Sequence, residues 1–230
     1  YDSFSEAGGL LRFGIPQYRL PISVLQKEIA LIKNLGVEFR FNQKLGKNLD
    51  IQDLQSNHDA VFLAIGAWKD IDLNIEGEDA NGVFSGTDLL KELALGKNPK
   101  LGQKVLVVGA GNVAIDAARS IWRLGKEVSI IYRRDKCDMP ANHIEIAESE
   151  AENIQFRFMA SPKAVLKDGN GKVRALQVEK MMCGGIDNSG RRRPVSTGEF
   201  EDIACDSIVL AIGERVDSHY LQSKKINITS

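Results

Sequence analysis

The sequence contains few cysteines, no long apolar run and no excess of either charge. Its three cysteines, Cys137, Cys183 and Cys205, include no CxxC pair, which excludes a disulfide framework, a thiol-pair redox centre and a zinc knuckle. We expect all three to be small, buried or half-buried apolar residues. Thirty Lys and Arg residues against 31 Asp and Glu give a formal net charge of −1, so the basic excess that nucleic-acid binding requires is missing.

No apolar run reaches the ~18 residues that span a bilayer, and no charged-then-apolar signal segment opens the chain. We therefore expect a cytoplasmic protein that does not contact a membrane. The chain starts at Tyr1 rather than Met, and residues 226–230 stop without a closing turn, so both ends are expected to be cut from something longer. With 43% hydrophobic residues among 230, a core is expected in one large domain or two small ones.

The first half of the chain predicts two helices and two strands. Residues 1–19 are punctuated by glycine and predict a loop. A helix should begin at Pro21 and end at Gly36, and the alternation over 37–41 predicts a strand. The apolar run at 60–65 predicts a buried strand, and residues 88–95 predict a short helix.

The second half predicts a βαβ unit followed by antiparallel strands. Strand 105–108, a glycine turn, a helix over 113–124 and strand 128–132 follow one another. Pro140 should start another helix, with Ile144, Ala147 and Ala151 on one face. Phe156 and Phe158 are expected on one face of a buried sheet. Turns at 168–171 and 187–190 predict hairpins, and 208–212 a buried strand. The predicted fold class is α/β, with a parallel sheet and an antiparallel excursion.

The turn inside the βαβ unit has the sequence Gly109-Ala110-Gly111-Asn112-Val113-Ala114, which is GxGxxA between a strand and a helix. The first glycine permits the tight turn, the second lets the backbone approach a pyrophosphate, and the small Ala114 allows close helix–strand packing. This pattern predicts a dinucleotide site, and the alternative is a plain glycine turn of an α/β sheet.

The next strand ends in Tyr132-Arg133-Arg134, where NAD-binding proteins carry a carboxylate for the ribose 2′-hydroxyl. The first carboxylate here is Asp135, after both arginines. Paired guanidinium groups suit a 2′-phosphate, so we predict NADP rather than NAD. The alternative is a solvated basic strand end.

Three blocks of sequence carry a family resemblance. They are residues 9–16 with Tyr18-Arg19-Leu20-Pro21, residues 109–114 with Asp116, Ala118 and Arg119, and Tyr132-Arg133-Arg134 followed by Met139-Pro140-Ala141. Together they closely resemble the small (beta) subunit of NADPH-dependent glutamate synthase and its relatives, which include the flavin/NADPH half of dihydropyrimidine dehydrogenase. The likeness covers nearly the whole chain.

The resemblance implies two Rossmann-like nucleotide-binding domains of the disulfide-oxidoreductase type. Residues 1–81 and 214–230 would be a partial FAD-binding domain, and residues 82–213 an NADPH-binding domain inserted within it. Hydride would pass from NADPH to FAD, and electrons would leave through iron–sulfur clusters on another domain or on a large subunit, since no cysteine cluster for such a centre is present. The first GxGxxG of the FAD domain and its C-terminal Gly-Asp segment fall outside these residues, so we expect FAD binding to be incomplete in this chain.

The resemblance also assigns site residues. Gly8, Gly9, Leu10, Arg12 and Gly14 would line the flavin side, and Asp2 would bind the FAD ribose. Ala64-Ile65-Gly66 and Ala211-Ile212-Gly213 would be the two crossings between the domains. With Gly109, Gly111, Asn112, Val113, Ala114, Arg133 and Arg134, these residues form the predicted cofactor sites.

No acid–base side chain is required for a hydride step, so we predict no catalytic residue, and no metal site. Glu145 and Glu148 either lie near the nicotinamide, by analogy, or form a solvated helix face. Two other functions compete with the flavin oxidoreductase. One is a non-catalytic NADP(H)-binding or scaffold module. The other is a disulfide reductase of the thioredoxin-reductase type, against which the absence of CxxC argues.

Overall fold

The computed structural model describes residues 1–226, and the chain divides into two compact units. The first unit is Tyr1–Lys69 together with the segment that begins at Glu214, and the second is Asp70–Gly213. The chain enters the second unit through β1 (Lys69–Asp70) and leaves it through β10 (Glu214–Arg215), and these two strands pair. The assignment of the two units to FAD and NADPH stays a prediction.

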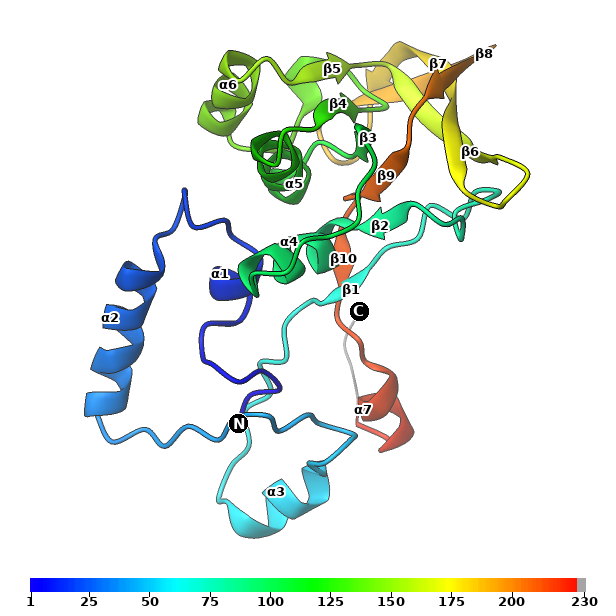
Figure 1. Ribbon diagram of the computed structural model, residues 1–230. Coiled ribbons are helices and arrows are strands. Elements are labelled where there is room, and N and C mark those ends of the chain that lie inside the picture. The colour runs from blue at the N-terminus through cyan, green and yellow to red at the C-terminus, as the bar shows by residue number, and fades with distance from the viewer. Residues whose placement is uncertain (227–230) are drawn as a thin grey trace. The chain divides into compact units, whose positions relative to one another are not determined.

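The second unit is built on a five-stranded sheet in the order β2-β9-β3-β4-β5, and every pair in it is parallel. The strands are β2 (Val83–Ser85), β3 (Lys104–Val108), β4 (Glu127–Ile131), β5 (Gln155–Arg157) and β9 (Ser207–Leu210). The helices α4 (Gly86–Ala94), α5 (Asn112–Arg123) and α6 (His143–Ala151) alternate with them, and a 3₁₀ turn, η1, covers Lys136–Asp138. The predicted βαβ unit is confirmed (Figure 1).

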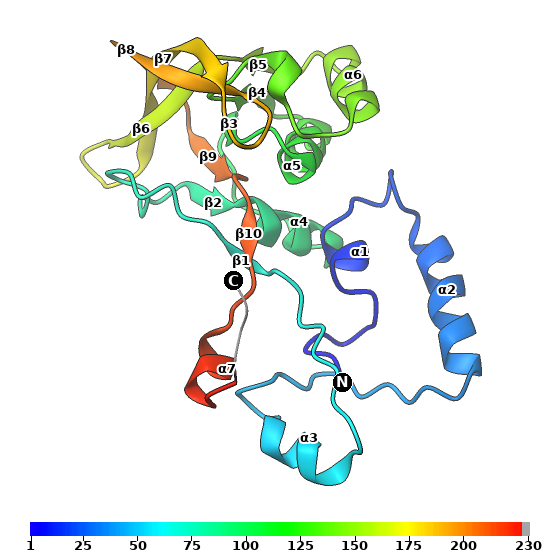
Figure 2. The ribbon, with the colours of Figure 1, turned by 180° about the vertical axis from the view of Figure 1, so that it is seen from behind.

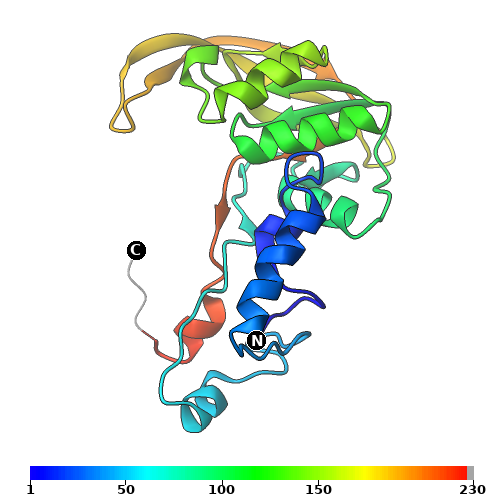
Figure 3. The same ribbon diagram turned by 90° about the vertical axis from the view of Figure 1, so that its left-hand side faces the viewer.

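A three-stranded antiparallel sheet packs on the opposite face from α5. It consists of β6 (Ala160–Lys167), β7 (Val173–Ile186) and β8 (Arg192–Ala204), joined by the two predicted hairpin turns. Leu176 and Val178 of this sheet share a buried cluster with Leu106 and Ile208 of the parallel sheet. In the view turned by 90°, α5 and α6 lie over the strands (Figure 3). The predicted antiparallel excursion is confirmed.

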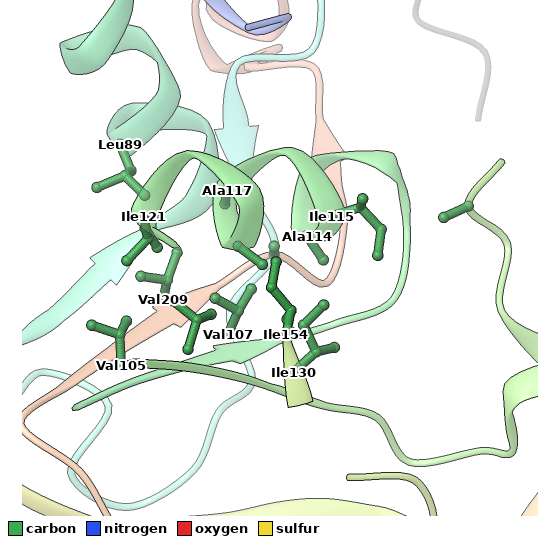
Figure 4. Packing of buried hydrophobic residues seen from close by; sticks show 14 of the residues in the cluster. Leu89, Val105, Val107, Ala114, Ile115, Ala117, Ile121, Ile130, Ile154 and Val209 are labelled. Atoms are coloured by element: carbon green, nitrogen blue, oxygen red, sulfur yellow. The ribbon is translucent and has the colours of Figure 1, made fainter. Parts of the chain in front are cut away.

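Helix α5 lies close to the sheet because the residues facing it are small. Ala114, Ala117 and Ile121 are fully buried, and they point toward Val107 and Val209 of the strands (Figure 4). Trp122, next to Ile121 on the same helix, is 39% exposed. This packing fixes the first turn of α5 at the carboxyl end of β3.

The helix predicted from Pro140 is present and begins at His143, but the face that carries Ile144, Ala147 and Ala151 is exposed to solvent. Ile144 is 54% exposed, whereas Ile146 and Ser149 are buried. The cause is electrostatic, because the buried Arg119 of α5 forms ion pairs with Glu145, with Glu148 at 2.7 Å and with Glu152 at 2.9 Å, which turns the acidic side of α6 toward α5. Glu145 and Glu148 are therefore structural partners of Arg119.

Glu152 gives this helix pair a pH-dependent stability. Burial raises its pKa, but hydrogen bonds from Arg119 and Arg123 lower it, and the net pKa lies below the ordinary 4.5. The stabilisation is therefore complete above pH 4.5 and is lost as the pH falls through the lower pKa of the folded state.

We expect Glu152→Gln to lower the free energy of unfolding by about 1 kcal/mol at pH 7. The difference from wild type should shrink as the pH falls below 4.5 and through the lower pKa of the folded state, because the wild-type side chain then becomes neutral like the glutamine. Glu148→Gln is the control, since Glu148 contacts the same arginine but is 51% exposed, and its effect should be smaller. Chemical denaturation at neutral and acidic pH measures both. A difference that does not change with pH would contradict the assignment.

The first unit contains four short helices: α1 (Gly9–Phe13), α2 (Ile22–Asn34), α3 (Ile51–Asn57) and α7 (His219–Ser223). The helix predicted from Pro21 is confirmed, whereas residues 1–19 contain α1 and are not entirely loop. The predicted strands at 37–41 and 60–65 are wrong: both stretches carry no strand among the described residues, and the connections on either side of α3 run without arrows (Figure 2). A strand needs a neighbour for its backbone hydrogen bonds, and Phe62, which should be buried, is 93% exposed.

The cysteine prediction is wrong for two of three residues. Cys137 and Cys183 are exposed, and Cys205 is buried, where desolvation raises the pKa of its thiol to about 12. No helix within residues 1–226 is long and apolar enough to cross a membrane. Within the same residues, no three His, Cys, Asp or Glu side chains gather where a metal ion could bind.

Candidate nucleotide-binding site

The glycine turn lies where three parallel strands end. The amide of Gly109 donates to the carbonyl of Ile131 at the end of β4, at 3.0 Å, and the amide of Ala211 after β9 donates to Val108 of β3, at 2.8 Å. Gly109 has φ of +133°, and a Cβ on it would lie 2.1 Å from the carbonyl oxygen of Ala211. Glycine is therefore required here by the neighbouring strand as well as by the turn.

The first turn of α5 presents its backbone without side-chain cover. Gly111 is the N-cap and provides no side-chain hydrogen bond, and no acidic residue stands in the first turn. A Cβ on Gly111 would meet no atom within 4 Å. Ala114 is fully buried and lies 3.4 Å from the position of a Cβ on Gly109, so a larger side chain would push the helix off the strand. These are the features that a pyrophosphate site at a helix N-terminus needs.

The segment after β4 folds back onto the glycine turn, a contact that the sequence did not predict. The amide of Asn142 donates to Oδ1 of Asn112 at 3.0 Å, and the amide of Ala141 donates to the carbonyl of Ala110 at 3.2 Å. The sequence did mark this segment, through the Met139-Pro140-Ala141 block of the family resemblance. Residue spacing alone, however, does not show that the segment contacts the glycine turn. Asn112 thus connects the pyrophosphate turn to the loop that carries the arginines.

The two arginines at the end of β4 have different environments. Arg133 is exposed to solvent. Arg134 has a side chain only 8% exposed, and its Nη2 forms an ion pair with Oδ2 of Asp187 at 2.7 Å, while its Nη1 is buried with no hydrogen-bond partner among residues 1–226. Sequence reasoning missed Asp187, whose only visible signal was its place in a hairpin turn.

The segment Ala211-Ile212-Gly213, the second predicted crossing between the domains, begins beside the glycine turn. Ala211 is buried and its Cβ lies 3.0 Å from where a Cβ on Gly86 would be, and the side chain of Val113 lies 3.3 Å from the same point. Gly213 has φ of +133° and its carbonyl accepts from the amide of Ile71 at 3.0 Å. The structure therefore brings the predicted residues 109–114 close to Ala211 at the carboxyl end of the sheet.

The predicted flavin residues lie in the first unit and are described there alone. Asp2 caps its own turn, because its Oδ1 accepts from the amide of Phe4 at 2.9 Å. Arg12 donates to the carbonyl of Ala7 at 2.6 Å and pairs with Glu6 at 2.5 Å. Gly9, Leu10 and Gly14 belong to α1 or end it, and Leu10 is 38% exposed. Ala64-Ile65-Gly66 lies in a segment without helix or strand, and Gly66 has φ of +72°. Their assignment to FAD stays a prediction.

Residues 18–230 match the sequence profile of the family described as pyridine nucleotide-disulphide oxidoreductase. Among curated proteins, the chain is 40% identical over 97% of its length to the beta subunit of an NADP(+)-dependent formate dehydrogenase from Moorella thermoacetica. It is 38% identical over 96% to the beta subunit of an NADPH-Fe(3+) oxidoreductase from Geobacter sulfurreducens. It is 33% identical over 94% to the glutamate synthase [NADPH] small chain of Escherichia coli. The resemblance found in the sequence is thereby confirmed.

The chain spans 32%, 34% and 48% of the lengths of these three relatives. Among solved structures, FprA from Mycobacterium tuberculosis in complex with NADPH superimposes with a TM-score of 0.76 at 23% identity, over 93% of this chain and 64% of that one. Thioredoxin reductase from T. acidophilum superimposes with a TM-score of 0.62 at 20% identity, over 96% and 70%. The predicted fold class is confirmed.

Proposed function

The chain belongs to the pyridine nucleotide-disulphide oxidoreductase family, and we propose that it is the NADPH-binding part of an FAD-dependent oxidoreductase whose electrons leave through iron–sulfur clusters. The observation that carries this proposal is the turn at 109–114, where a bare helix N-terminus, an open Gly111 and the exposed Arg133 are combined in one unit. When bound, NADPH supplies a hydride, and FAD accepts it and releases electrons singly to one-electron acceptors.

The residues of the second unit fit NADPH. Backbone amides at the start of α5 would hold the pyrophosphate, because the helix dipole and the unpaired N–H groups both favour an anion there. Asn112 fixes the loop that carries the arginines, and Arg133 would hold the 2′-phosphate with its fork of donors. Gly109 and Ala114 set the distance between helix and strand, and Ala211 bounds the turn on the side of β9.

We propose that residues of the first unit contribute to a flavin site. Asp2 for the ribose and the glycine-flanked α1 are the elements that the resemblance assigns to FAD. We propose that an iron–sulfur domain or a large subunit is the partner, in line with three relatives that are named as subunits or chains of larger enzymes. The exposed, unpaired thiols of Cys137 and Cys183 support a reducing compartment, so we place the protein in the cytoplasm.

Recording the visible spectrum of the purified chain and its NADPH-dependent reduction of an artificial electron acceptor, with and without added FAD, tests this proposal. Because FAD binding is expected to be incomplete, we expect no flavin absorption from the chain alone and reduction that requires both NADPH and added FAD. Binding of NADPH without any FAD-dependent turnover would favour the alternative, a non-catalytic NADP(H)-binding or scaffold module. A thioredoxin-reductase type of activity is not expected, because the sequence has no CxxC pair.

A further inference from the structure

The hairpin between β7 and β8 places a carboxylate on one of the two arginines of the proposed 2′-phosphate site. Oδ2 of Asp187 lies 2.7 Å from Nη2 of Arg134, across 53 residues of sequence. The two side chains are 17% and 8% exposed, so the pair is mostly shielded from water. The second anchor of a 2′-phosphate is therefore already occupied by an anion of the chain itself.

The other oxygen of Asp187 is committed to the hairpin turn. Oδ1 accepts from the amide of Ser189 at 2.8 Å and from its hydroxyl at 2.5 Å. These hydrogen bonds hold the pKa of Asp187 far below its usual range, so the carboxylate is charged at neutral pH. Because Oδ2 alone faces Arg134, breaking the ion pair leaves the turn intact.

A second contact holds the hairpin on the loop after β4. The amide of Arg192 donates to Oδ1 of Asp138 at 3.0 Å, and its Nε donates to Oδ2 of the same residue at 3.1 Å. Nη2 of Arg192 also lies 3.2 Å from Asp135. The hairpin therefore stays in place when Arg134 changes its partner.

Asp187 does not satisfy all the hydrogen-bond donors of the Arg134 guanidinium. Its Nη1 is buried and has no hydrogen-bond partner among the described residues, an unfavourable state for an N–H group. A phosphate monoester offers three acceptor oxygens and a charge of about −1.5 to −2 at pH 7, against two oxygens and a single charge for a carboxylate. Phosphate also accepts from two guanidinium nitrogens at once. It is thus the stronger acceptor for Arg134.

We propose that Asp187 is a stand-in for the 2′-phosphate: it occupies Arg134 in the empty site, and the phosphate of NADP(H) displaces its Oδ2. This inference rests on the proposed NADP(H) site. A nucleotide without the 2′-phosphate carries no group that replaces Asp187 there. Asp187 therefore lowers the affinity for NADP(H), leaves the affinity for NAD(H) unchanged, and determines how strongly the protein distinguishes the two.

The variant Asp187→Asn tests this, because an amide keeps an oxygen for Ser189 and removes the charge that pairs with Arg134. The matched control is Asp168→Asn in the β6–β7 turn. Oδ1 of Asp168 accepts from the amides of Asn170 at 2.8 Å and Lys172 at 2.9 Å, which is the same turn role. We expect Asp187→Asn to bind NADPH about tenfold more tightly with NADH unchanged, and Asp168→Asn to match wild type for both nucleotides.

Calorimetric titration measures these affinities, and thermal unfolding of each variant verifies that it is folded. If Asp187→Asn is destabilised relative to Asp168→Asn, Asp187→Ser, which keeps a short acceptor, replaces it. In an Arg134→Gln background, removing the charge of Asp187 should no longer change NADPH binding. Unchanged NADPH binding by folded Asp187→Asn overturns the inference. Weaker binding overturns it too, because Asp187 would then position Arg134 for the phosphate. Wild type that binds neither nucleotide overturns the proposed function as well, whereas wild type that binds NADPH leaves the function standing.

Discussion

Gly111→Ala is expected to leave the fold intact and to weaken NADPH binding about a hundredfold. A Cβ on Gly111 meets no protein atom within 4 Å, and its φ of −84° is available to alanine, so the empty protein should tolerate the change. The loss arises only when a pyrophosphate approaches the N-terminus of α5, because the new methyl group keeps it away from the backbone amides. Thermal unfolding and titration with NADPH measure the two halves of this prediction.

Gly109→Ala is the matched comparison, two residues away in the same turn. Here a Cβ would lie 2.1 Å from the carbonyl oxygen of Ala211, and φ is +133°. We expect a loss of stability of about 3–5 kcal/mol, because the strained backbone and the overlap with the carbonyl of Ala211 act together. Equal losses of stability in the two variants would contradict the separation of a structural glycine from a ligand-facing one.

Arg133→Ala should weaken NADPH binding about thirtyfold and leave NADH binding unchanged. Arg133 is exposed, so its loss costs the empty protein little, whereas a charge-assisted contact to the 2′-phosphate disappears. Arg174→Ala on β7 is the control, since Arg174 is also exposed and the site does not include it. Titration of both variants with both nucleotides measures the effect. A parallel loss of NADH affinity would mean that Arg133 supports the loop rather than the phosphate.

The βαβ part of the parallel sheet was predictable from sequence because each of its elements carries a local signal, whereas the short edge strand β2 was not predicted. The order is strand 104–108, then the glycine turn, then α5. The spacing of Ala114, Ala117 and Ile121 indicates the buried face of α5. The face of α6 was not predictable. An ion pair with the buried Arg119 overrides the apolar spacing of Ile144 and Ala147, and that partner lies on another helix.

The failed strands at 37–41 and 60–65 show a different limit. An apolar or alternating run indicates that a segment suits a strand. Whether the strand forms depends on a neighbouring segment that supplies the backbone hydrogen bonds. The stretch 37–41 has only the start of such a neighbour, since the amide of Asp2 donates to the carbonyl of Arg40 at 2.9 Å but no strand forms there among the described residues. In the stretch 60–65, Phe62 is exposed.

The candidate site also contains residues that the sequence predicts and residues that it does not. The positions of Gly109, Gly111 and Ala114 follow from the local motif, and their roles follow from its place between strand and helix. The unequal environments of Arg133 and Arg134 do not, because Asp187 reaches Arg134 from a hairpin turn 53 residues later. Contacts between distant segments depend on strand register, here that of β7 and β8 with their two irregularities, and sequence spacing does not fix such a register.

The central claim is that the second unit holds NADP(H) at the turn 109–114 and recognises its 2′-phosphate. Calorimetric titration of the chain with NADPH and with NADH tests this claim most directly. The account predicts that NADPH binds at least about tenfold more tightly than NADH, the contribution of a charge-assisted phosphate contact. Equal affinities would contradict the phosphate assignment, and no binding of either nucleotide would contradict the nucleotide site itself.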